Sequence, residues 1–312
     1  MSASICSERV QLRSGAIAHY ARSGESGPPV VLLHGGLPGA SGEAGWRFML
    51  PALAEAGFRA YAPDRPGFGK ADTREPYVPK LGWLSHLEFL SQFVDAVCLD
   101  TFCLGGNSMG ATLAALFAVG NPHRVERLAL VASNGLNQRL RVDASMVRRH
   151  ERGVNQFDGT MESMRATLLG IMHHPDSVTD ELVERRYADA VRQEQCYEAA
   201  MSWNRSAESN PDFVQLLNLE GRLDRITIPT IYLYGAQDAM SPVENAYLQE
   251  DKLPNVQFFY PQDCGHQGQT DQPEMFNAVF CEFFGTGKVS PQTAVWAGIS
   301  DRRAPLQNIV SG

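Results

Sequence analysis

Short apolar runs alternate with helical stretches along most of this chain, and this alternation constrains the fold more than any other feature. Each run is bounded by glycine, proline or asparagine, which is typical of strands buried on both faces of a parallel sheet. The runs are 29–33, 59–62, 101–104, 127–131, 230–234 and 256–260. Leu, Ala and Phe recur between them at helical spacing, in 48–56, 84–97 and 109–119. We therefore expect an α/β protein with a mostly parallel, doubly wound sheet.

The alternation stops between about residues 136 and 208. Apolar residues there repeat at helical spacing, with no strand signal between them. They include Met161, Met164, Leu168, Ile171 and Met172. Strand signals resume at Ile226, and the last helix is expected over 273–284. We predict that 1–135 and 209–285 form the core and that 136–208 form an inserted helical lid. Residues 286–312 are then a C-terminal extension that packs on the body or on a neighbouring subunit.

Composition excludes several classes of protein. The chain has 312 residues, of which 44% are hydrophobic and 20% charged, so a folded globular protein with a sizeable core is expected. Its net charge of −8 argues against nucleic acid as a partner. It shows neither a long apolar run nor a basic and apolar leader, so we expect a cytoplasmic protein with no membrane contact. The six cysteines form no C-x-x-C pair, so we expect reduced thiols, no metal and no cofactor.

The sharpest chemical signal is the segment Gly106-Asn107-Ser108-Met109-Gly110, between an expected strand and an expected helix. It fits the Gly-x-Ser-x-Gly elbow, in which a strained turn exposes a serine hydroxyl at the helix N-terminus and leaves no room for larger flanking residues. The alternative is a structural turn. The strand before it and the helix after it favour Ser108 as a catalytic nucleophile.

A serine nucleophile needs a base and an orienting acid, which follow it in the order acid, then histidine. Asp238 comes just after the run 230–234, and His266 comes just after the run 256–260. Both therefore lie at the sheet edge where such proteins place their sites. Asp263 is the rival acid, and a solvated loop carboxylate is the alternative for either. The paired His173 and His174 are expected at the surface, without a metal-ligand pattern. The remaining histidines do not follow the last strand: His19, His34, His86, His123 and His150.

Acyl-type chemistry also needs N–H donors aimed at a developing oxyanion. The segment 34–39 is glycine-rich and directly follows the run 29–33, so its backbone is suited to supply one. We expect the amides of Gly36 and Met109, with Leu37 as the alternative to Gly36. A simple glycine-rich turn is the other interpretation of this segment. The segment 64–69, after the next run, is expected to be a structural turn.

A helix of the expected lid carries one arginine on its apolar face. Thr179 is a candidate cap, and apolar residues then form one stripe: Leu182, Val183, Tyr187, Ala190 and Val191. Arg186 falls within that stripe, whereas Arg185 and Arg192 fall outside it. A buried arginine needs an anion, which is either a lid carboxylate in an internal ion pair or the carboxylate of a substrate.

With this elbow, acid, histidine and glycine turn in this order, the chain resembles the α/β-hydrolase fold superfamily. From about residue 14 to 284 it looks like the meta-cleavage-product hydrolases, which hydrolyse a carbon–carbon bond in 2-hydroxy-6-oxo-dienoates made by aromatic ring fission. The resembling segments are 34–36, 38–40, 55–59, 106–110, 176–187 and 264–266.

The resemblance implies that Asn107 and Arg186 bind the dienol and carboxylate end of the substrate, and it places Gly35 and Gln267 beside them. Members of the family usually carry tryptophan where this chain has Gln267, and a third glycine where it has Leu37. The implied reaction is ketonisation of the dienol and then attack on the remote ketone, assisted by Ser108 and His266, through either an acyl-enzyme or a gem-diol. Relatives form dimers or larger assemblies, so the resemblance also implies a homo-oligomer.

Two other functions fit parts of this pattern. An ester, lactone or amide hydrolase would use the same three side chains. A non-catalytic binding protein on the same fold would leave the triad without a role. The aspartate nucleophile of epoxide hydrolases and haloalkane dehalogenases is absent, because Ser108 stands at that position.

Overall fold

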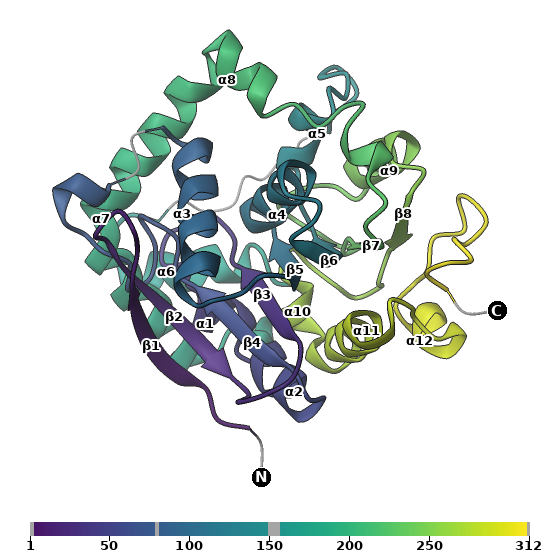
Figure 1. The fold of residues 1–312 in the computed structure, drawn as a ribbon, viewed down its shortest axis with the longest axis horizontal. Coiled ribbons are helices and arrows are strands. Elements are labelled where there is room, and N and C mark those ends of the chain that lie inside the picture. Colours follow the sequence, from purple (N-terminus) through teal and green to yellow (C-terminus); the bar gives the residue numbers. More distant parts are fainter. Residues whose placement is uncertain (1–2, 79–80, 149–156, 311–312) are drawn as a thin grey trace.

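The structure, a computed structural model, describes residues 3–78, 81–148 and 157–310. Its strands form one sheet in the order β1-β2-β4-β3-β5-β6-β7-β8 (Figure 1). β2 pairs antiparallel with β1 and β4, and the other pairs are parallel. The strands are β1 (Cys6–Gln11), β2 (Ile17–Ser23), β3 (Pro29–Leu33), β4 (Arg59–Pro63), β5 (Phe102–Asn107), β6 (Val125–Val131), β7 (Thr230–Leu233) and β8 (Val256–Phe259).

The six predicted runs correspond to β3 to β8, which confirms the mostly parallel sheet. β1 and β2, at the antiparallel end of the sheet, were not predicted from the sequence. β1 is polar and largely exposed, so no buried apolar run marks it. β2 lies between β1 and β4 and is mostly buried, but it includes the polar residues His19, Arg22 and Ser23, so it also lacks a continuous apolar run.

Helices cover both faces of the sheet because alternate residues of each central strand point to opposite sides. In β3, Val31 and Leu33 belong to the apolar cluster that includes α3 and α4, whereas Val30 and Leu32 belong to the cluster that includes α2 and α11. Figure 1 shows α3 and α4 on one side of the strands and α2 and α11 on the other. The helices outside the β6–β7 segment are α1 (Gly42–Trp46), α2 (Met49–Glu55), α3 (Trp83–Ala96), α4 (Met109–Gly120), α9 (Glu244–Lys252), α10 (Gly268–Asp271), α11 (Pro273–Thr286) and α12 (Pro291–Trp296).

The segment between β6 and β7 contains helices and no strand in the residues that the structure describes. They are α5 (Gly135–Arg139), α6 (Met161–Leu169), α7 (Asp180–Glu208) and α8 (Pro211–Leu216). Thr179 caps α7 as predicted, because its Oγ1 accepts a hydrogen bond from Leu182 N at 3.2 Å. Of the predicted stripe, Leu182, Val183 and Ala190 are buried, but Val191 is 50% exposed and its assignment to the stripe was wrong. Ala190 is the last residue of α7 in the apolar cluster that also contains Met164 and Leu168 of α6. Beyond it, an apolar residue in register with the stripe has no such neighbour among the described residues to cover it.

Regular secondary structure continues beyond the helix that was predicted to be the last. α11 continues to Thr286, where Gly287 takes the left-handed conformation that ends many helices (φ 75°). A further short helix, α12, follows. The extension then packs on the body along the outer side of β8: Gly298 O accepts from Tyr260 N at 2.6 Å, and Ser300 N donates to Phe258 O at 3.0 Å. It leaves Val295 and Trp296 exposed. None of the described helices combines the length and apolar character needed to span a bilayer.

Candidate active site

Ser108 occupies a strained turn between β5 and α4. Its backbone has φ 56° and ψ −122°, a region that non-glycine residues rarely adopt. The two flanking glycines make this turn possible: a methyl group at Gly106 would collide with Gly110 O, and one at Gly110 with Leu33 O. The turn is held by a hydrogen bond from Ser108 N to Val131 O, at 2.8 Å. The serine is thus partly exposed at the N-terminus of α4, at the carboxyl edge of the sheet.

Asp238 and His266 lie together at the same edge. His266 Nδ1 is 2.7 Å from Asp238 Oδ2, and each residue is 2% exposed. Asp238 Oδ1 accepts hydrogen bonds from the backbone N–H groups of Met240 and Ser241, each at 2.9 Å. This carboxylate therefore fixes the tautomer with the proton on Nδ1, which leaves Nε2 as the nitrogen able to accept a proton. Nε2 is buried without a hydrogen-bond partner among the described residues.

Asn107 connects the serine turn to the histidine loop. Its side-chain Nδ2 donates to His266 O at 3.0 Å and lies 3.4 Å from Val131 O. No hydrogen bond joins Ser108 Oγ to His266 Nε2 in the described part of the chain, and such contacts are often loose in a structure without substrate. The side-chain N–H groups of Asn107 are thus already hydrogen-bonded, in part, to backbone carbonyls of this site.

The alternatives to these residues lie elsewhere. The Asp263 side chain is 74% exposed, and its Oδ1 lies 3.8 Å from His173 Nε2 rather than beside His266. His19 pairs with the buried Asp64 at 2.7 Å. His123 is exposed. His150 lies outside the described residues. The described residues contain no cluster of three or more His, Cys, Asp or Glu side chains able to hold a metal ion.

The histidine loop is also tied to the β6–β7 segment. His266 N donates to Ile171 O at 2.8 Å, and the Asp271 carboxylate accepts from Gly265 N and His173 N at 2.8 and 2.9 Å. Gln267 is buried, and its carbonyl begins α10 by accepting from Thr270 N at 2.7 Å. Gln267 thus starts the short helix that follows the histidine, and its predicted contact with substrate stays a prediction.

The glycine loop after β3 lies against the serine turn. A methyl group at Gly35 would lie 3.3 Å from Asn107 Oδ1 and 3.5 Å from Ser108 Cβ. One at Gly36 would lie 2.8 Å from Met109 Sδ. The glycine loop and the start of α4 are thus in contact, so Gly36 and Met109 are neighbours; that their N–H groups serve as the oxyanion donors stays a prediction.

The loop after β4 does more than the predicted structural turn. Asp64 has that structural role, since its carboxylate accepts from the N–H groups of Gly42 and Lys70, each at 2.7 Å. Its neighbour Arg65, however, reaches into the glycine loop: Nη2 donates to His34 O at 2.9 Å and to Gly35 O at 2.6 Å. This role of Arg65 was not predicted from the sequence. Its place directly after a strand end was the available signal.

Arg186 is buried on α7, with 1% of its surface exposed. Its Nε and Nη2 have no hydrogen-bond partner among the described residues, and no described carboxylate forms an ion pair with it. Burial lowers the pKa of its guanidinium to about 10, partly offset by the charge of Asp189. The pKa of nearby Arg47 is also lowered to about 10, chiefly by burial. Arg186 and Arg47 thus lie near each other, with Asp189 as an acidic neighbour of Arg186, and the described residues supply no ion pair for Arg186.

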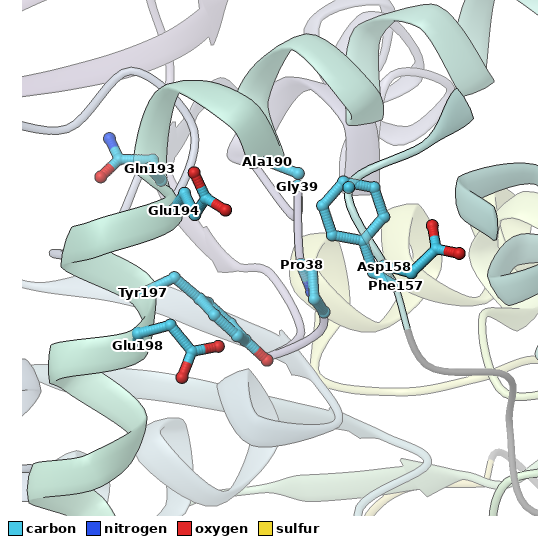
Figure 2. Close-up of a pocket in the computed structure, with 10 residues that line it drawn as sticks. Pro38, Gly39, Phe157, Asp158, Ala190, Gln193, Glu194, Tyr197 and Glu198 are labelled. Carbon is cyan, nitrogen blue, oxygen red and sulfur yellow. The ribbon is translucent and has the colours of Figure 1, made fainter. Parts of the chain in front are cut away.

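α7 contacts the glycine loop at two points. Gly39 has φ 70°, and a methyl group there would collide with the carbonyl oxygen of Arg186. Tyr197 OH donates to Gly36 O at 3.2 Å, and Figure 2 shows the Tyr197 ring directed from the helix toward this loop. A cavity of about 360 Å³ lies between the loop and α7, with Phe157 on its other side.

Comparison with known proteins identifies the fold family. The family model described as "alpha/beta hydrolase fold" matches residues 28–273. A 2-hydroxy-6-oxononadienedioate/2-hydroxy-6-oxononatrienedioate hydrolase from Paraburkholderia phymatum is 30% identical over 271 residues, which cover 86% of this chain and 90% of that protein.

Two further proteins that resemble this chain carry names of the same kind. A 2-hydroxy-6-oxo-6-(2'-aminophenyl)hexa-2,4-dienoic acid hydrolase from Metapseudomonas resinovorans is 28% identical, over 86% of this chain and 88% of that protein. A crystal structure of a variant of a meta-cleavage product hydrolase (CumD), from Pseudomonas fluorescens, is 27% identical. It superposes with a TM-score of 0.73 over 89% of this chain and 97% of that one. The chain therefore belongs to the α/β-hydrolase fold family, and its relatives within that family include meta-cleavage-product hydrolases.

Proposed function

We propose that this protein hydrolyses a carbon–carbon bond in a carboxylate-bearing ring-fission product of the 2-hydroxy-6-oxo-dienoate type. The observation that carries this choice of substrate is Arg186. A buried guanidinium without an ion pair in the described chain is destabilising unless an anion from outside the chain completes it. A substrate carboxylate is such an anion, and it matches the diacid and dienoic acid substrates in the names of the relatives.

The geometry at the sheet edge supports the following catalytic roles. Ser108 is the nucleophile or the group that activates water, His266 Nε2 accepts its proton, and Asp238 orients the imidazole and stabilises its charged form. The N–H groups of Gly36 and Met109 hold the oxyanion that forms on the attacked ketone. The carbon–carbon bond then breaks, and the proton on His266 passes to the dienolate that leaves. Where Ser108 is the nucleophile, water, deprotonated by His266 Nε2, attacks the acyl group left on Oγ, and release of the carboxylic acid returns the proton to the serine. Ketonisation of the dienol comes first, so that the leaving fragment is a stabilised dienolate.

The substrate is held on the other side of the attacked carbonyl. Arg186 binds its carboxylate, and Asn107, Gly35 and Gln267 line the dienol end next to the serine. We assign residues 136–208 as the lid, residues 1–135 and 209–285 as the core, and 286–312 as an extension of the core. α7 contributes Arg186 from the lid, so the substrate is enclosed between lid and core.

We also propose a cytoplasmic homo-oligomer. The exposed Val295 and Trp296 on α12 are apolar side chains that contact between two copies would cover. Sedimentation velocity of the purified protein gives a mass near twice 34.3 kDa or a higher multiple if this holds, and a single-chain mass if it does not.

A stopped-flow absorbance experiment tests the proposed reaction. The protein is mixed with a small panel of 2-hydroxy-6-oxo-dienoates, and with 4-nitrophenyl butyrate as the ester control. Rapid loss of the visible dienolate absorbance, far faster than ester cleavage, is the expected result. Rapid ester cleavage with untouched dienolates would move the assignment to an esterase, lactonase or amide hydrolase with the same triad.

A further inference from the structure

The carbonyl of Gly35 accepts two hydrogen bonds from buried side chains. Arg65 Nη2 donates to it at 2.6 Å, and His34 Nδ1 lies 2.8 Å from it. His34 Nε2 accepts from Arg65 N at 3.1 Å, so the His34 proton is on Nδ1 and that nitrogen also donates to Gly35 O. Burial, together with the charge of Arg65, holds the pKa of His34 well below its usual value, which keeps this imidazole neutral.

These two hydrogen bonds fix the direction of the next N–H group. In a trans peptide the C=O of one residue and the N–H of the next point in opposite directions. Holding Gly35 O between Arg65 and His34 therefore turns the Gly36 N–H away from them. Within the described residues, no acceptor is bound to that N–H. Gly36 in turn lies against Met109, the first residue of α4.

Arg65 also brings a charge that the described chain does not neutralise. It is fully buried, its Nε and Nη1 have no hydrogen-bond partner among the described residues, and its guanidinium carbon lies 4.8 Å from the centre of the Phe68 ring. A cation that donates to a carbonyl polarises the whole peptide, which makes the attached N–H a stronger donor. Such a site also favours a negative charge on the far side of the peptide.

We propose that Arg65 is a positioning residue for the oxyanion site: it holds and polarises the Gly35–Gly36 peptide so that the Gly36 N–H, rather than that of Leu37, stabilises the oxyanion formed at Ser108. This inference rests on the proposed function and deepens it. Leu37 N–H belongs to the next peptide, whose carbonyl, Gly36 O, accepts a hydrogen bond from the neutral Tyr197 hydroxyl at 3.2 Å and from no charged group among the described residues. The two candidate donors are therefore supported by two different side chains, which substitution can separate.

The test uses phenylboronic acid, whose boron accepts a bond from Ser108 Oγ while the serine proton passes to His266 Nε2. The resulting tetrahedral boronate places an oxygen at the oxyanion position and does not depend on the choice of substrate. Binding is measured by isothermal titration calorimetry, and the folding of each variant by its thermal midpoint. The variants are Arg65→Met, Arg65→Lys, Tyr197→Phe, Ser108→Ala and Arg139→Met. The last is the matched control, a second buried arginine that lies over the Trp83 ring instead of the glycine loop.

We expect Arg65→Met to weaken boronate binding on the order of tenfold, less than the loss of a whole donor, with Arg139→Met and Tyr197→Phe within about twofold of wild type. Equal binding by Arg65→Met and wild type would overturn the proposal. So would an equal loss in Arg139→Met, which would indicate general loosening, or a larger loss in Tyr197→Phe, which would assign the donor to Leu37.

Two further variants keep the outcome decisive. If Arg65→Met does not fold, Arg65→Lys takes its place: it keeps the charge but not the paired contacts to His34 O and Gly35 O, and a loss of about threefold is expected. Unchanged binding by that variant would contradict the role of Arg65. If wild type binds no more tightly than Ser108→Ala, the proposed nucleophile itself is wrong, and the inference fails with it.

Discussion

At the sheet edge the polar groups around Ser108 are held by hydrogen bonds within the protein, and the buried guanidinium there, Arg65, donates to two backbone carbonyls although it has no ion pair in the described residues. In the β6–β7 segment α7 buries the guanidinium of Arg186, which has neither an ion pair nor an acceptor for its Nε and Nη2 among the described residues. Asp238 Oδ1 accepts two N–H groups and Gly35 O accepts two side-chain donors, so each has its partners before any ligand arrives. Arg186, by contrast, has two nitrogen atoms, Nε and Nη2, without an acceptor among the described residues.

This difference separates two tasks. A group that must act on a transition state works best when its position is fixed beforehand, because no reorganisation is then needed during the reaction. A group that recognises a substrate contributes more to affinity when its hydrogen-bond donors lack acceptors in the free protein, because the ligand then supplies the missing acceptor. In the function proposed above, the core carries the chemistry and α7 carries the selection of a carboxylate.

The largest effect is expected from removing the nucleophile. Ser108→Ala should lower dienolate turnover by at least about a thousandfold, since it removes the group that His266 activates. Single-turnover absorbance traces check this. Dienolate binding should survive, because its carboxylate contact lies on α7. Turnover at the wild-type rate would show that another residue attacks the ketone.

Asp238→Asn should lower turnover by about a hundredfold to ten-thousandfold, because an amide does not fix the His266 tautomer or stabilise its charge. Asp263→Asn is the matched control, and its exposed carboxylate should leave kcat unchanged. Steady-state kinetics of both variants check the pair. A loss in Asp263→Asn that equals the loss in Asp238→Asn would contradict the assignment.

Arg186→Met should have opposite effects on stability and on binding. At neutral pH the charged form of Arg186 destabilises the fold, because burial lowers its pKa to about 10, and this penalty shrinks as the pH rises past that value. The variant should thus be more stable by about 1 kcal/mol or more, while its dienolate kcat/KM falls by about tenfold to a hundredfold.

Urea unfolding and steady-state kinetics check this pair of effects. Arg185→Met is the control, since Arg185 pairs with Glu43 and Glu181 outside the apolar stripe. Its dienolate kinetics should stay near wild type. A destabilised Arg186→Met with unchanged kinetics would instead make Arg186 a structural ion-pair residue.

The smallest effect on turnover is expected where α7 packs on the glycine loop; the expected change there is in stability. Gly39→Ala should lower the free energy of unfolding by about 2 kcal/mol or more, because φ is positive and the new methyl group meets the Arg186 carbonyl. Gly57→Ala is the control, because Gly57 also has a positive φ but a methyl group there would meet no atom within 4 Å. It should cost about 1 kcal/mol. Equal losses would show that α7 does not press on the loop.

How much of the site could be predicted from the sequence depended on how far apart in the chain the contacting residues lie. The Ser108 turn was predictable because its requirements, Gly106 and Gly110, are neighbours in the chain. Asp238 and His266 were placed together by strand order alone, and Arg186 was placed by the face of a single helix.

Arg65 and Tyr197 were not predictable in the same way. Each contacts the glycine loop from a segment 30 or more residues away, and which side chain reaches a given carbonyl depends on how the loops pack. The same reason explains α12 and the fold-back of the extension on β8. The exposed Val191 shows the converse: an apolar residue in register is buried only where a neighbour covers that turn of the helix.

A difference-spectrum titration tests the division between core and lid most directly. One dienolate is titrated into Ser108→Ala and into the double variant with Arg186→Met, so that binding is measured without turnover. We predict that Ser108→Ala binds the dienolate and that adding Arg186→Met raises Kd by about tenfold or more. An unchanged Kd in the double variant would contradict the account, because the carboxylate would then be held elsewhere.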